Sequence, residues 1–275
     1  MLTASVVIHN TPQNVFLKTV DCLLNSEIDR IFIIDNSRSG EYKNSLPPDD
    51  RIIYLKAENK GYGAANNIAI KQAEIMGSEM HLVVNPDVYW TGDVITSLLK
   101  EMEANPDIGL IAPKLKYPDG SLQFSCRMLP TPADLFAKRF LPARLSEKRI
   151  KRYLLKDYNH DVAINCPYLT GAFLLFRMEA LKECGLFDTR FFLYPEDIDI
   201  TRRIHEKYKT VYFPEVTVFH DHAQASKKNL RMFFIHLANM IKYFNKWGWR
   251  NDVLRKEFND RLSGQLLKIN AAQGS

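Results

Sequence analysis

The chain has 275 residues, of which 46% are hydrophobic, and its formal net charge is +5. This composition excludes a disordered protein, and the length suits one large α/β domain or two ordinary ones. Lys and Arg are spread along the chain, so the charge favours an anionic partner only weakly, and no basic stripe accompanies a nucleic-acid-binding motif. We therefore expect a globular protein that does not bind nucleic acid.

Cysteine spacing and the absence of long apolar runs bear on the compartment. Cys22, Cys126, Cys166 and Cys184 show neither a C-x-x-C pair nor metal-finger spacing, which favours a reducing compartment. The N-terminus has no basic region before its short apolar run, and nowhere do about 18 consecutive apolar residues occur. These features predict a cytoplasmic protein without a membrane-spanning helix.

Strand and helix patterns alternate through the first 112 residues. Apolar runs predict strands at 2–8, 31–34, 52–55, 82–84 and 108–112. Apolar residues at helical spacing predict helices at 11–24, 61–76 and 93–102. Strands that alternate with helices imply a mostly parallel sheet with helices on both faces. Residues 1–112 are thus predicted to form a Rossmann-like half.

The pattern changes after Pro113. Asp119-Gly120 lies between two apolar segments and indicates a hairpin, whereas the charged, proline-containing segment 130–161 predicts a mobile or inserted region. Residues 169–176 are apolar, and 211–219 are predicted to form a strand. Further helices are predicted at 178–184, 195–205, 227–247 and from 251 onward. We expect residues 113–225 to complete the same domain and residues 226–275 to form a C-terminal helical extension.

Polar residues follow three of the predicted strands, as His9-Asn10, Asp35-Asn36-Ser37 and Asn85-Pro86-Asp87. The carboxyl ends of parallel strands meet at one edge, which is where open α/β sheets bind ligands. Because proline cannot donate to a sheet ladder, the third strand should end there and present the following carboxylate. Such carboxylates can accept bonds from a base or ribose, or hold a divalent cation that bridges phosphates. Ordinary turns with Asx hydrogen bonds are the alternative.

Two glycines begin the second predicted helix, in the sequence Asn59-Lys60-Gly61-Tyr62-Gly63. Free backbone N–H groups at a helix start favour an anion. However, the segment lacks both the P-loop Gly-Lys-Ser/Thr and the full Rossmann glycine pattern. The small residues would equally allow the helix to pack closely, and this alternative remains open.

Glu196, Asp197 and Asp199 lie in the first turn of a predicted helix that begins at Pro195. Acids at the positive end of a helix dipole and an i,i+4 pair with Arg203 explain Asp199 without a functional role. The aromatic residues around this turn could desolvate a carboxylate and raise its pKa toward the range of a general base. Two histidines, 220 and 222, end the later strand and are either surface residues or part of a site.

The order of these segments resembles the inverting family-two glycosyltransferases of the GT-A fold, and within them the rhamnosyltransferase-like branch. The similarity runs from about residue 3 to about residue 226. It rests on Ser5-Val6-Val7-Ile8-His9-Asn10, Ile34-Asp35-Asn36-Ser37, Asn59-Lys60-Gly61-Tyr62-Gly63 with Asn66-Asn67, Asn85-Pro86-Asp87, Thr170-Gly171-Ala172-Phe173, Gly185-Leu186-Phe187-Asp188, Phe192-Leu193-Tyr194-Pro195-Glu196-Asp197-Ile198-Asp199 and His220.

The resemblance implies roles for individual residues. Those on the donor side would be His9, Asn10, Asp35, Asn59, Gly61, Asn66, Asn67 and Asn85. Asp87 and His220 would lie at a divalent cation, Mg²⁺ or Mn²⁺, beside the donor diphosphate. Asp197 would be the general base, with Gly171, Ala172 and Glu196 on the acceptor side. Asn85 stands where many relatives have aspartate, so the protein would offer a cation one charge fewer.

The activity implied by the resemblance is transfer of a sugar, rhamnose in this branch, from a nucleotide-diphosphate sugar with inversion. The acceptor would be a saccharide or lipid-linked saccharide in bacterial surface polysaccharide synthesis. The alternative is a catalytically silent nucleotide- or carbohydrate-binding protein on the same scaffold. Aromatic and basic residues from 227 to 250 suit either peripheral contact with an anionic membrane or packing against the domain or a second subunit.

Overall fold

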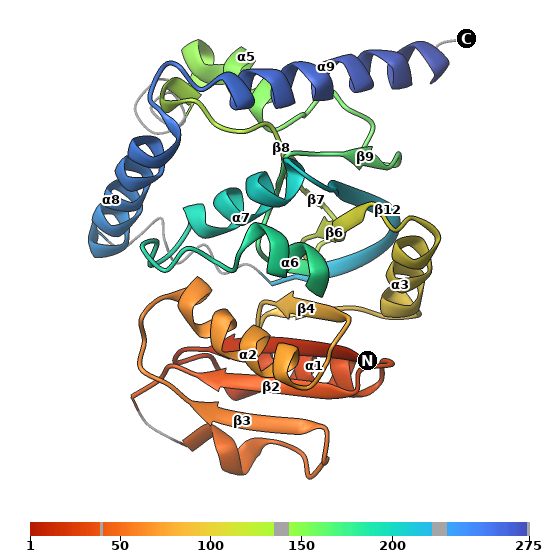
Figure 1. Ribbon diagram of the computed structural model, residues 1–275, viewed down its shortest axis with the longest axis vertical. Helices are drawn as coiled ribbons and strands as arrows, with labels where there is room; N and C mark the ends of the chain where they lie inside the picture. The colour runs from red at the N-terminus through yellow and green to blue at the C-terminus, as the bar shows by residue number, and fades with distance from the viewer. Residues whose placement is uncertain (39–40, 135–142, 222–229, 274–275) are drawn as a thin grey trace.

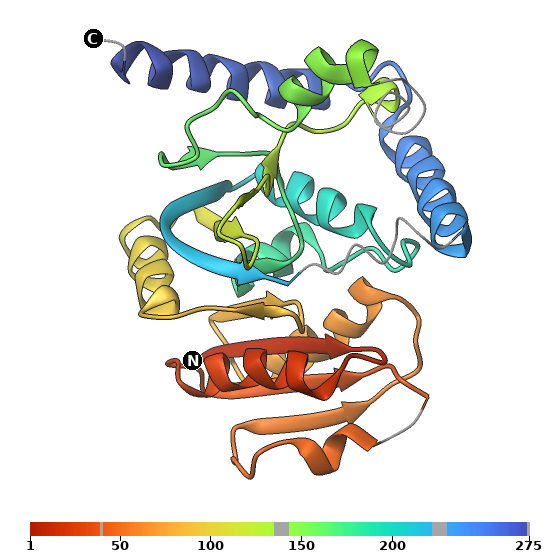
Figure 2. The same ribbon diagram turned by 180° about the vertical axis from the view of Figure 1, so that it is seen from behind.

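The computed structural model describes residues 1–38, 41–134, 143–221 and 230–273. The views from opposite sides in Figures 1 and 2 show a central twisted sheet between helices, with two long C-terminal helices outside it. The strands are β1 (Leu2–Ile8), β2 (Arg30–Asp35), β3 (Ile52–Lys56), β4 (Met80–Val84), β5 (Val88–Tyr89), β6 (Ile108–Lys116), β7 (Leu122–Gln123), β8 (Cys126–Arg127), β9 (Ile164–Asn165), β10 (Tyr168–Leu169), β11 (Phe173–Arg177) and β12 (Lys209–His220).

Except at 143–153, the α-helices lie where the apolar periodicity predicts them, with ends shifted by a few residues. They are α1 (Gln13–Leu24), α2 (Tyr62–Ile75), α3 (Val94–Ala104), α5 (Ala143–Tyr153), α6 (Met178–Cys184), α7 (Pro195–His205), α8 (Leu230–Trp247) and α9 (Val253–Gln273), with a short 3₁₀ helix at Glu41–Ser45. Because successive βα units wind around the sheet, the helices cover both of its faces (Figures 1 and 2).

The sheet has the strand order β3-β2-β1-β4-β11-β6-β12-β5. Strands β3, β2, β1 and β4 are parallel, and so are β6 and β12, whereas β11 runs antiparallel between β4 and β6. The expected α/β fold with a mostly parallel sheet and C-terminal helices is confirmed. Since β1, β2 and β4 point the same way, the residues that follow them lie at one edge of the sheet.

Each face of the sheet has its own apolar core. Small residues of α2, such as Ala65 and Ala69, pack with α6 and α7 on one face. On the other face, Phe16 of α1 and Leu98 of α3 are fully buried with the opposite side chains of the strands. Alternation along each strand sends consecutive side chains to the two cores, and the near-continuous apolar strand sequences follow from that.

Within the segment 130–161, where the sequence predicts a mobile or inserted region, residues 143–153 form α5. Tyr153 and Leu155 are buried in the same core as α7, which explains why this charged segment is helical. Its outward side carries the charges, including Lys148 and Arg152. Residues 135–142 lie outside the described residues. The division of the chain at 112 and 225 stays a prediction, and β6 runs through the first of these points.

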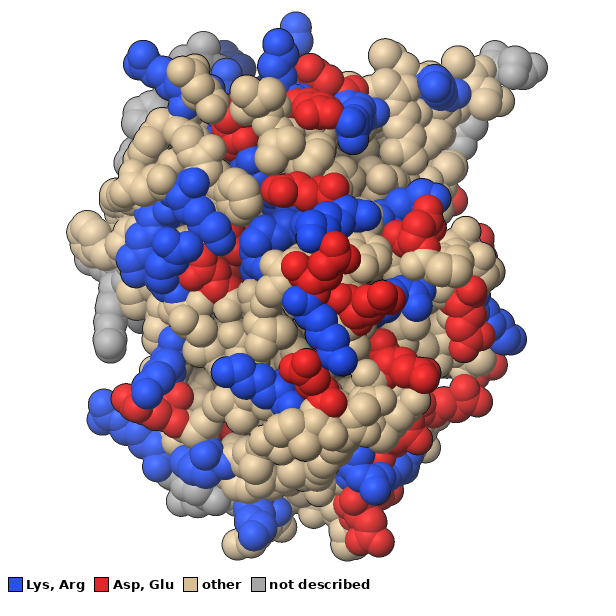
Figure 3. Space-filling model, viewed as in Figure 1, with Lys and Arg blue, Asp and Glu red and all other residues tan. Residues whose placement is uncertain are grey.

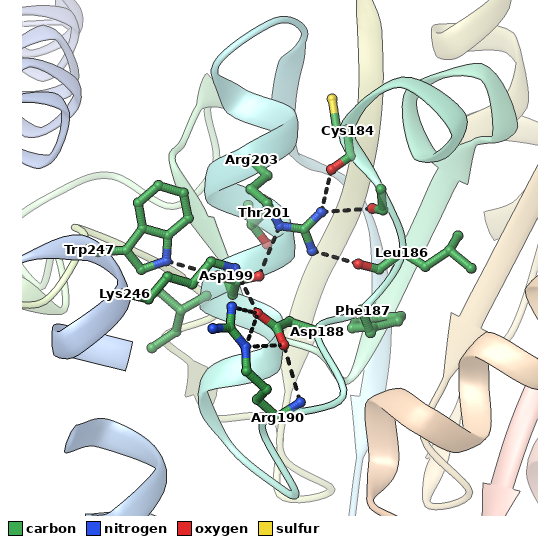
Figure 4. Close-up of polar contacts among 12 residues, drawn as sticks. Cys184, Leu186, Phe187, Asp188, Arg190, Asp199, Thr201, Arg203, Lys246 and Trp247 are labelled. Carbon is green, nitrogen blue, oxygen red and sulfur yellow. Dashed lines mark hydrogen bonds and ion pairs between the residues drawn. The ribbon is translucent and has the colours of Figure 1, made fainter. Parts of the chain in front are cut away.

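A buried polar cluster joins α8 to α7 and to the loop before it (Figure 4). Lys246 Nζ lies 2.6 Å from Asp199 Oδ1 and 2.9 Å from Asp188 Oδ2. Trp247 Nε1 also donates to Asp199 Oδ1, at 2.8 Å, and Arg203 Nε donates to Asp199 Oδ2 at 2.9 Å. The interpretation of Asp199 as the i,i+4 partner of Arg203 is confirmed. The C-terminal extension is thus bonded to the helix whose first turn carries Glu196 and Asp197.

Candidate active site

The polar ends of β1, β2 and β4 lie together, as the parallel order requires. His9 Nδ1 is 3.0 Å from the carbonyl oxygen of Asn36, and the amide of Asn10 donates to Ser37 Oγ at 2.8 Å. The backbone amide of Asn85 donates to the backbone carbonyl of Ala172 at 2.9 Å. A cavity of about 1490 Å³ opens at this edge. The predicted site residues that line it are His9, Asn59, Asn85, Asp87, Gly171, Ala172, Glu196, Asp197 and His220.

Asp87 and His220 face each other within this cavity. The last residue of β12 pairs with Val88 in β5, and this pairing brings His220 Nε2 to 3.2 Å from Asp87 Oδ1. Asn85 Nδ2 lies 3.4 Å from the same ring nitrogen. Because Asn85 and Asp87 flank Pro86 just after the end of β4, both side chains reach the ring from one turn.

Gln123 in β7 fixes the orientation of the His220 ring. Its Nε2 donates to the backbone carbonyl of His220 at 2.8 Å, so its Oε1, 2.9 Å from Nδ1, faces the ring as an acceptor. Nδ1 therefore carries a proton, and the lone pair of Nε2 in the neutral ring points toward Asp87. A histidine whose second nitrogen donates to a carbonyl oxygen is the usual arrangement at metal sites.

The donor set at this position fits a hard divalent cation that shares a diphosphate. One carboxylate and one imidazole are available, and phosphate oxygens would supply the remaining ligands. Within residues 1–38, 41–134, 143–221 and 230–273, no cluster of three or more His, Cys, Asp or Glu side chains could hold a metal by protein ligands alone. The geometry therefore suits a cation that arrives with its nucleotide better than a permanently bound one.

Asp197 lies in the first turn of α7, next to the backbone of Gly171. Its Oδ2 accepts the amide of Gly171 at 3.0 Å, and its Oδ1 accepts the amide of Ile198 at 2.8 Å. Burial raises the pKa of Asp197 to about 6, although these two amides and the charge of Arg127 act in the opposite direction. A carboxylate with this pKa is ionised at neutral pH and is a stronger base than an ordinary aspartate.

The helix that carries these acids begins under backbone strain. Pro195 is its first residue, and Tyr194 before it has a φ of +93°, which a non-glycine residue rarely adopts. The Tyr194 ring packs edge-on against His236 of α8, with centroids 4.8 Å apart. Strained residues of this kind concentrate at functional sites, because the surrounding packing must hold them in place.

Beyond Asp197 the cavity is walled by apolar side chains of the C-terminal extension. Those from α8 and the turn after it are Phe233, Ile235, Leu237, Met240, Ile241, Phe244 and Trp249. Leu237, Ile241 and Trp249 are each more than 40% exposed. The cavity thus changes from polar at Asp87 and His220 to apolar along α8.

Comparison with known proteins identifies the fold and the family. Residues 3–185 match the family described as glycosyl transferase family 2. The chain belongs to this family. Among solved structures, GalNAc-T7 with UDP, GalNAc and Mn²⁺ has a TM-score of 0.60 at 15% identity, covering 80% of this chain and 42% of that chain. The structure of S. aureus TarS has a TM-score of 0.56 at 13% identity, covering 97% of this chain and 42% of the TarS chain. These likenesses show the GT-A fold.

Curated relatives in the family include two rhamnosyltransferases. The N-acetylglucosaminyl-diphospho-decaprenol L-rhamnosyltransferase of Mycobacterium tuberculosis is 29% identical over 195 residues, which are 66% of this chain and 62% of that protein. Rhamnosyltransferase WbbL of Escherichia coli is 25% identical over 244 residues, covering 85% and 87% of the two chains. The chain therefore spans less than two thirds of the mycobacterial relative's length.

Asp35 and Asn66 do not reach the cavity of this family-two chain, contrary to expectation. Asp35 is fully buried, and it accepts the hydroxyl of Tyr54 at 2.5 Å and the ammonium of Lys56 at 2.9 Å. Burial alone would raise the pKa of Asp35, but these bonds and the amide of Ser37 lower it overall. Asn66 Oδ1 accepts the hydroxyl of Ser5 at 2.8 Å inside the core. Both side chains hold α2 and β3 to the sheet.

Asn67, Gly61 and Asn10 also do not line the cavity. Asn67 is buried and exchanges two bonds, of 2.8 and 3.0 Å, with the backbone of Phe187. Gly61 has a φ of +109°, and the backbone of Phe192 lies directly over it. The amide of Tyr62 donates to the Phe192 carbonyl at 3.0 Å, so the helix start faces a protein oxygen. The close-packing alternative for these glycines explains their positions. Asn10 is exposed beside His9.

Replacing Gly61 with Ala should destabilise the fold more than the same change at Gly77. A Cβ at Gly61 would lie 2.5 Å from the Phe192 carbonyl oxygen, whereas none of the described atoms lies within 4 Å of one at Gly77, which also has positive φ. Gly77→Ala incurs about 1–2 kcal/mol of left-handed strain. Gly61, at φ +109° and ψ +162°, lies in a backbone region that is essentially restricted to glycine, so Gly61→Ala adds both this backbone strain and the clash. Urea unfolding of both variants measures the difference, and equal losses would contradict this role for Gly61.

Several cavity residues were not identified from the sequence. Gln123 lies in the predicted hairpin, but nothing in its surroundings indicates a bond to His220, 97 residues away. Arg127 and Tyr168 lie on the short paired strands β8 and β10, and the Tyr168 hydroxyl is 3.5 Å from Asp197 Oδ2. Only their aromatic and cationic types, near an apolar run, could have suggested them. His222, which was singled out with His220, lies outside the described residues.

Proposed function

We propose that the protein is an inverting glycosyltransferase that moves a sugar from a nucleoside-diphosphate sugar to a hydroxyl of a saccharide acceptor. One observation carries this proposal. A single cavity holds the Asp87–His220 pair, suited to a diphosphate and its cation, together with a carboxylate of raised pKa at Asp197. Membership of glycosyl transferase family 2 supports this assignment.

The residues divide the reaction between them. Asp197 accepts the proton of the acceptor hydroxyl as that oxygen bonds to the anomeric carbon, and the bond from that carbon to the diphosphate breaks on the opposite face. Attack from the face opposite the leaving group inverts the configuration. Gly171 and Ala172 border the acceptor side next to Asp197, and His9, Asn59 and Asn85 border the donor side.

Asp87 and His220 are the proposed cation-binding residues, and Mg²⁺ or Mn²⁺ is the proposed ion. When bound, such a cation neutralises charge on the leaving diphosphate. The structure of GalNAc-T7 contains UDP and Mn²⁺, which supports a nucleotide and a divalent cation on this fold in general terms. Asn85 supplies an amide instead of a second carboxylate, so the site depends on the diphosphate for charge.

Rhamnose is the proposed donor sugar, and a lipid-linked saccharide is the proposed acceptor, within the synthesis of a bacterial surface polysaccharide on the cytoplasmic side of the membrane. The names of the two rhamnosyltransferase relatives support the sugar. The change of the cavity from polar to apolar along α8 supports an acceptor that joins a sugar to an apolar tail.

Peripheral membrane contact through α8 belongs to the same proposal. Phe234 is 63% exposed on the helix that carries Leu237 and Ile241, with Lys242 and Arg250 exposed nearby. Exposed apolar side chains beside cations suit an anionic membrane surface. Within the described residues, none of the helices is both long and apolar enough to cross a bilayer. If the full chain binds anionic vesicles and Phe234→Ser binds them more weakly, the result supports this contact. Homodimerisation through α8 would instead appear as an increase in molecular mass with protein concentration.

On the face shown in Figure 3, Lys and Arg side chains lie mixed with Asp and Glu over most of the surface. This face therefore offers no continuous basic surface of the kind that binds nucleic acid. The partners that the proposal requires are a nucleotide sugar and a saccharide acceptor.

A nucleotide screen tests the proposal directly. Thermal shifts are measured with UDP, dTDP and GDP, each with and without Mn²⁺, because a ligand that binds the folded state raises the melting temperature according to its concentration over Kd. We expect one nucleotide to stand out and to require the cation. Hydrolysis or transfer of the matching sugar should then be detectable, whereas nucleotide binding without turnover of any donor would favour the silent binding protein.

The pH dependence of transfer should report the base. Because the pKa of Asp197 is raised to about 6, the base is protonated below that pH and ionised above it. We expect kcat/KM to fall about tenfold per pH unit below pH 6 and to level off above it. Initial rates between pH 4.5 and 8, at a fixed cation concentration, measure this acidic limb of the pH profile. A midpoint near the pKa of an ordinary aspartate, about 4, would contradict the assignment.

A further inference from the structure

Glu196 is a buried carboxyl group that the proposed reaction does not yet explain. It precedes Asp197 in the first turn of α7 and lines the cavity, yet the residue is only 4% exposed. Its Oε2 has no hydrogen-bond partner within the described part of the chain, and no ion pair with it occurs there. An ionised carboxylate in such a position would lose hydration that the backbone amides of Glu196 and Tyr194 compensate only in part.

The groups packed around this carboxyl do not supply a cation to it. Tyr62 of α2 and Tyr168 of β10, which interact with this carboxyl, have pKa values raised by burial, so they are neutral at working pH. Arg127 of β8 lies 3.5 Å from the Tyr168 hydroxyl, and its charge lowers the pKa of Asp197. Asp197 itself is the neighbouring anion.

The two adjacent acids have different environments. Asp197 accepts two amide hydrogen bonds and is influenced by Arg127, whereas burial and the charge of Asp197 both raise the pKa of Glu196 well above its ordinary value. The backbone amides of Glu196 and Tyr194 oppose this shift only in part. Two close carboxyl groups with unequal environments separate into one acid and one base.

We propose that Glu196 remains protonated while Asp197 is ionised, so that the pair carries one proton, and that the Glu196 hydroxyl donates a hydrogen bond to an oxygen of the acceptor sugar. The first part concerns the protein alone; the second rests on the proposed function. Glu196 keeps its proton during transfer, and Asp197 receives the proton of the attacking hydroxyl. A neutral Glu196 also avoids a second negative charge beside the base.

Infrared spectroscopy tests the protonation state without requiring activity. The full chain is labelled with ¹³C-glutamate, and difference spectra are recorded at pH 7 for the wild type and Glu196→Gln. We expect a carbonyl band of a protonated carboxyl that shifts with the label and disappears in Glu196→Gln. Glu183→Gln is the matched control, because Glu183 is exposed and bonded to Lys207, so this change should leave the band in place. Absence of the band in the wild type would overturn the proposal.

Kinetics test the bond to the acceptor. Glutamine retains an N–H donor but carries no charge, so Glu196→Gln should keep the midpoint of the acidic limb of the pH profile. Glu196→Ala removes the donor and should raise the acceptor KM about tenfold. This increase should be larger than the one in Glu196→Gln. A midpoint that moves down by about one pH unit in Glu196→Gln would show that the wild-type residue is ionised, since removal of a neighbouring negative charge lowers the pKa of Asp197. If none of the proteins turns over a donor, the proposed function fails, and the infrared result still decides the protonation state.

Discussion

Asp197→Asn should lower kcat about a thousandfold, because general bases typically contribute between about 10² and 10⁴ to the rate. Asparagine has the same shape, and its single amide oxygen can still accept one of the two backbone amides, of Gly171 and Ile198, that lie 3.0 and 2.8 Å from the two carboxylate oxygens. The fold and the donor site should therefore remain intact. Single-turnover transfer from the matching nucleotide sugar measures the loss, and thermal shift with the nucleotide and Mn²⁺ measures donor binding.

The control for this change is Asp50→Asn, which removes one carboxylate from an exposed loop before β3. It should leave both transfer and nucleotide binding unaltered. If Asp197→Asn retained wild-type kcat, the base would be another group and the role assigned to Asp197 would be wrong. If it lost nucleotide binding as well, its effect would be on the fold, and the kinetic loss would say nothing about proton transfer.

The sequence was sufficient to predict that several polar residues share one edge of the sheet. His9 and Asp87 follow apolar strands that alternate with helices, and a parallel arrangement places such positions together. Pro86 marks the end of β4, and Asn85 and Asp87 on either side of it reach one imidazole ring in the structure. Local patterns decide these features, because strand direction and proline chemistry act over a few residues.

The sequence could not show which polar residues turn inward. Asp35 also follows a parallel strand, but Tyr54 and Lys56 on the neighbouring β3 satisfy its carboxylate, and that pairing depends on register. The sequence around Asn67 suggests a residue that contacts a ligand, yet its side-chain amide donates to the backbone carbonyl of Phe187, 120 residues away. Long-range partners of this kind are set by tertiary packing, and no periodicity in the chain encodes them.

The same limit applies to the sheet centre and to α5. β11 enters antiparallel between β4 and β6, and the alternating βα pattern, which predicts a mostly parallel sheet, does not show where such a strand would lie. The charged, proline-containing sequence of 130–161 predicts a mobile or inserted region without indicating a helix, whereas the burial of Tyr153 stabilises a helix at 143–153 whose other side is solvated. In both cases packing against distant elements outweighed the local signal.

Asp87→Asn should weaken nucleoside-diphosphate binding in the presence of Mn²⁺ by about a hundredfold or more, because the site then retains an imidazole and no carboxylate for the cation. Without Mn²⁺ the two proteins should bind the nucleotide similarly, since the change removes only a cation ligand. Calorimetric titration with the preferred diphosphate, with and without the cation, separates these contributions. Equal losses with and without Mn²⁺ would mean that Asp87 contacts the nucleotide directly.

Asn85→Asp supplies the matched change in the opposite direction. It places a second carboxylate at the position whose Nδ2 now lies 3.4 Å from His220 Nε2, and it changes no shape. If Asn85 limits the charge available to the cation, this variant should need less Mn²⁺ for half-maximal nucleotide binding than the wild type. Gln123→Leu should have the opposite effect, by about tenfold to a hundredfold, because the His220 ring loses the acceptor that fixes its tautomer. A cation requirement that none of these three changes alters would place the ion away from Asp87 and His220.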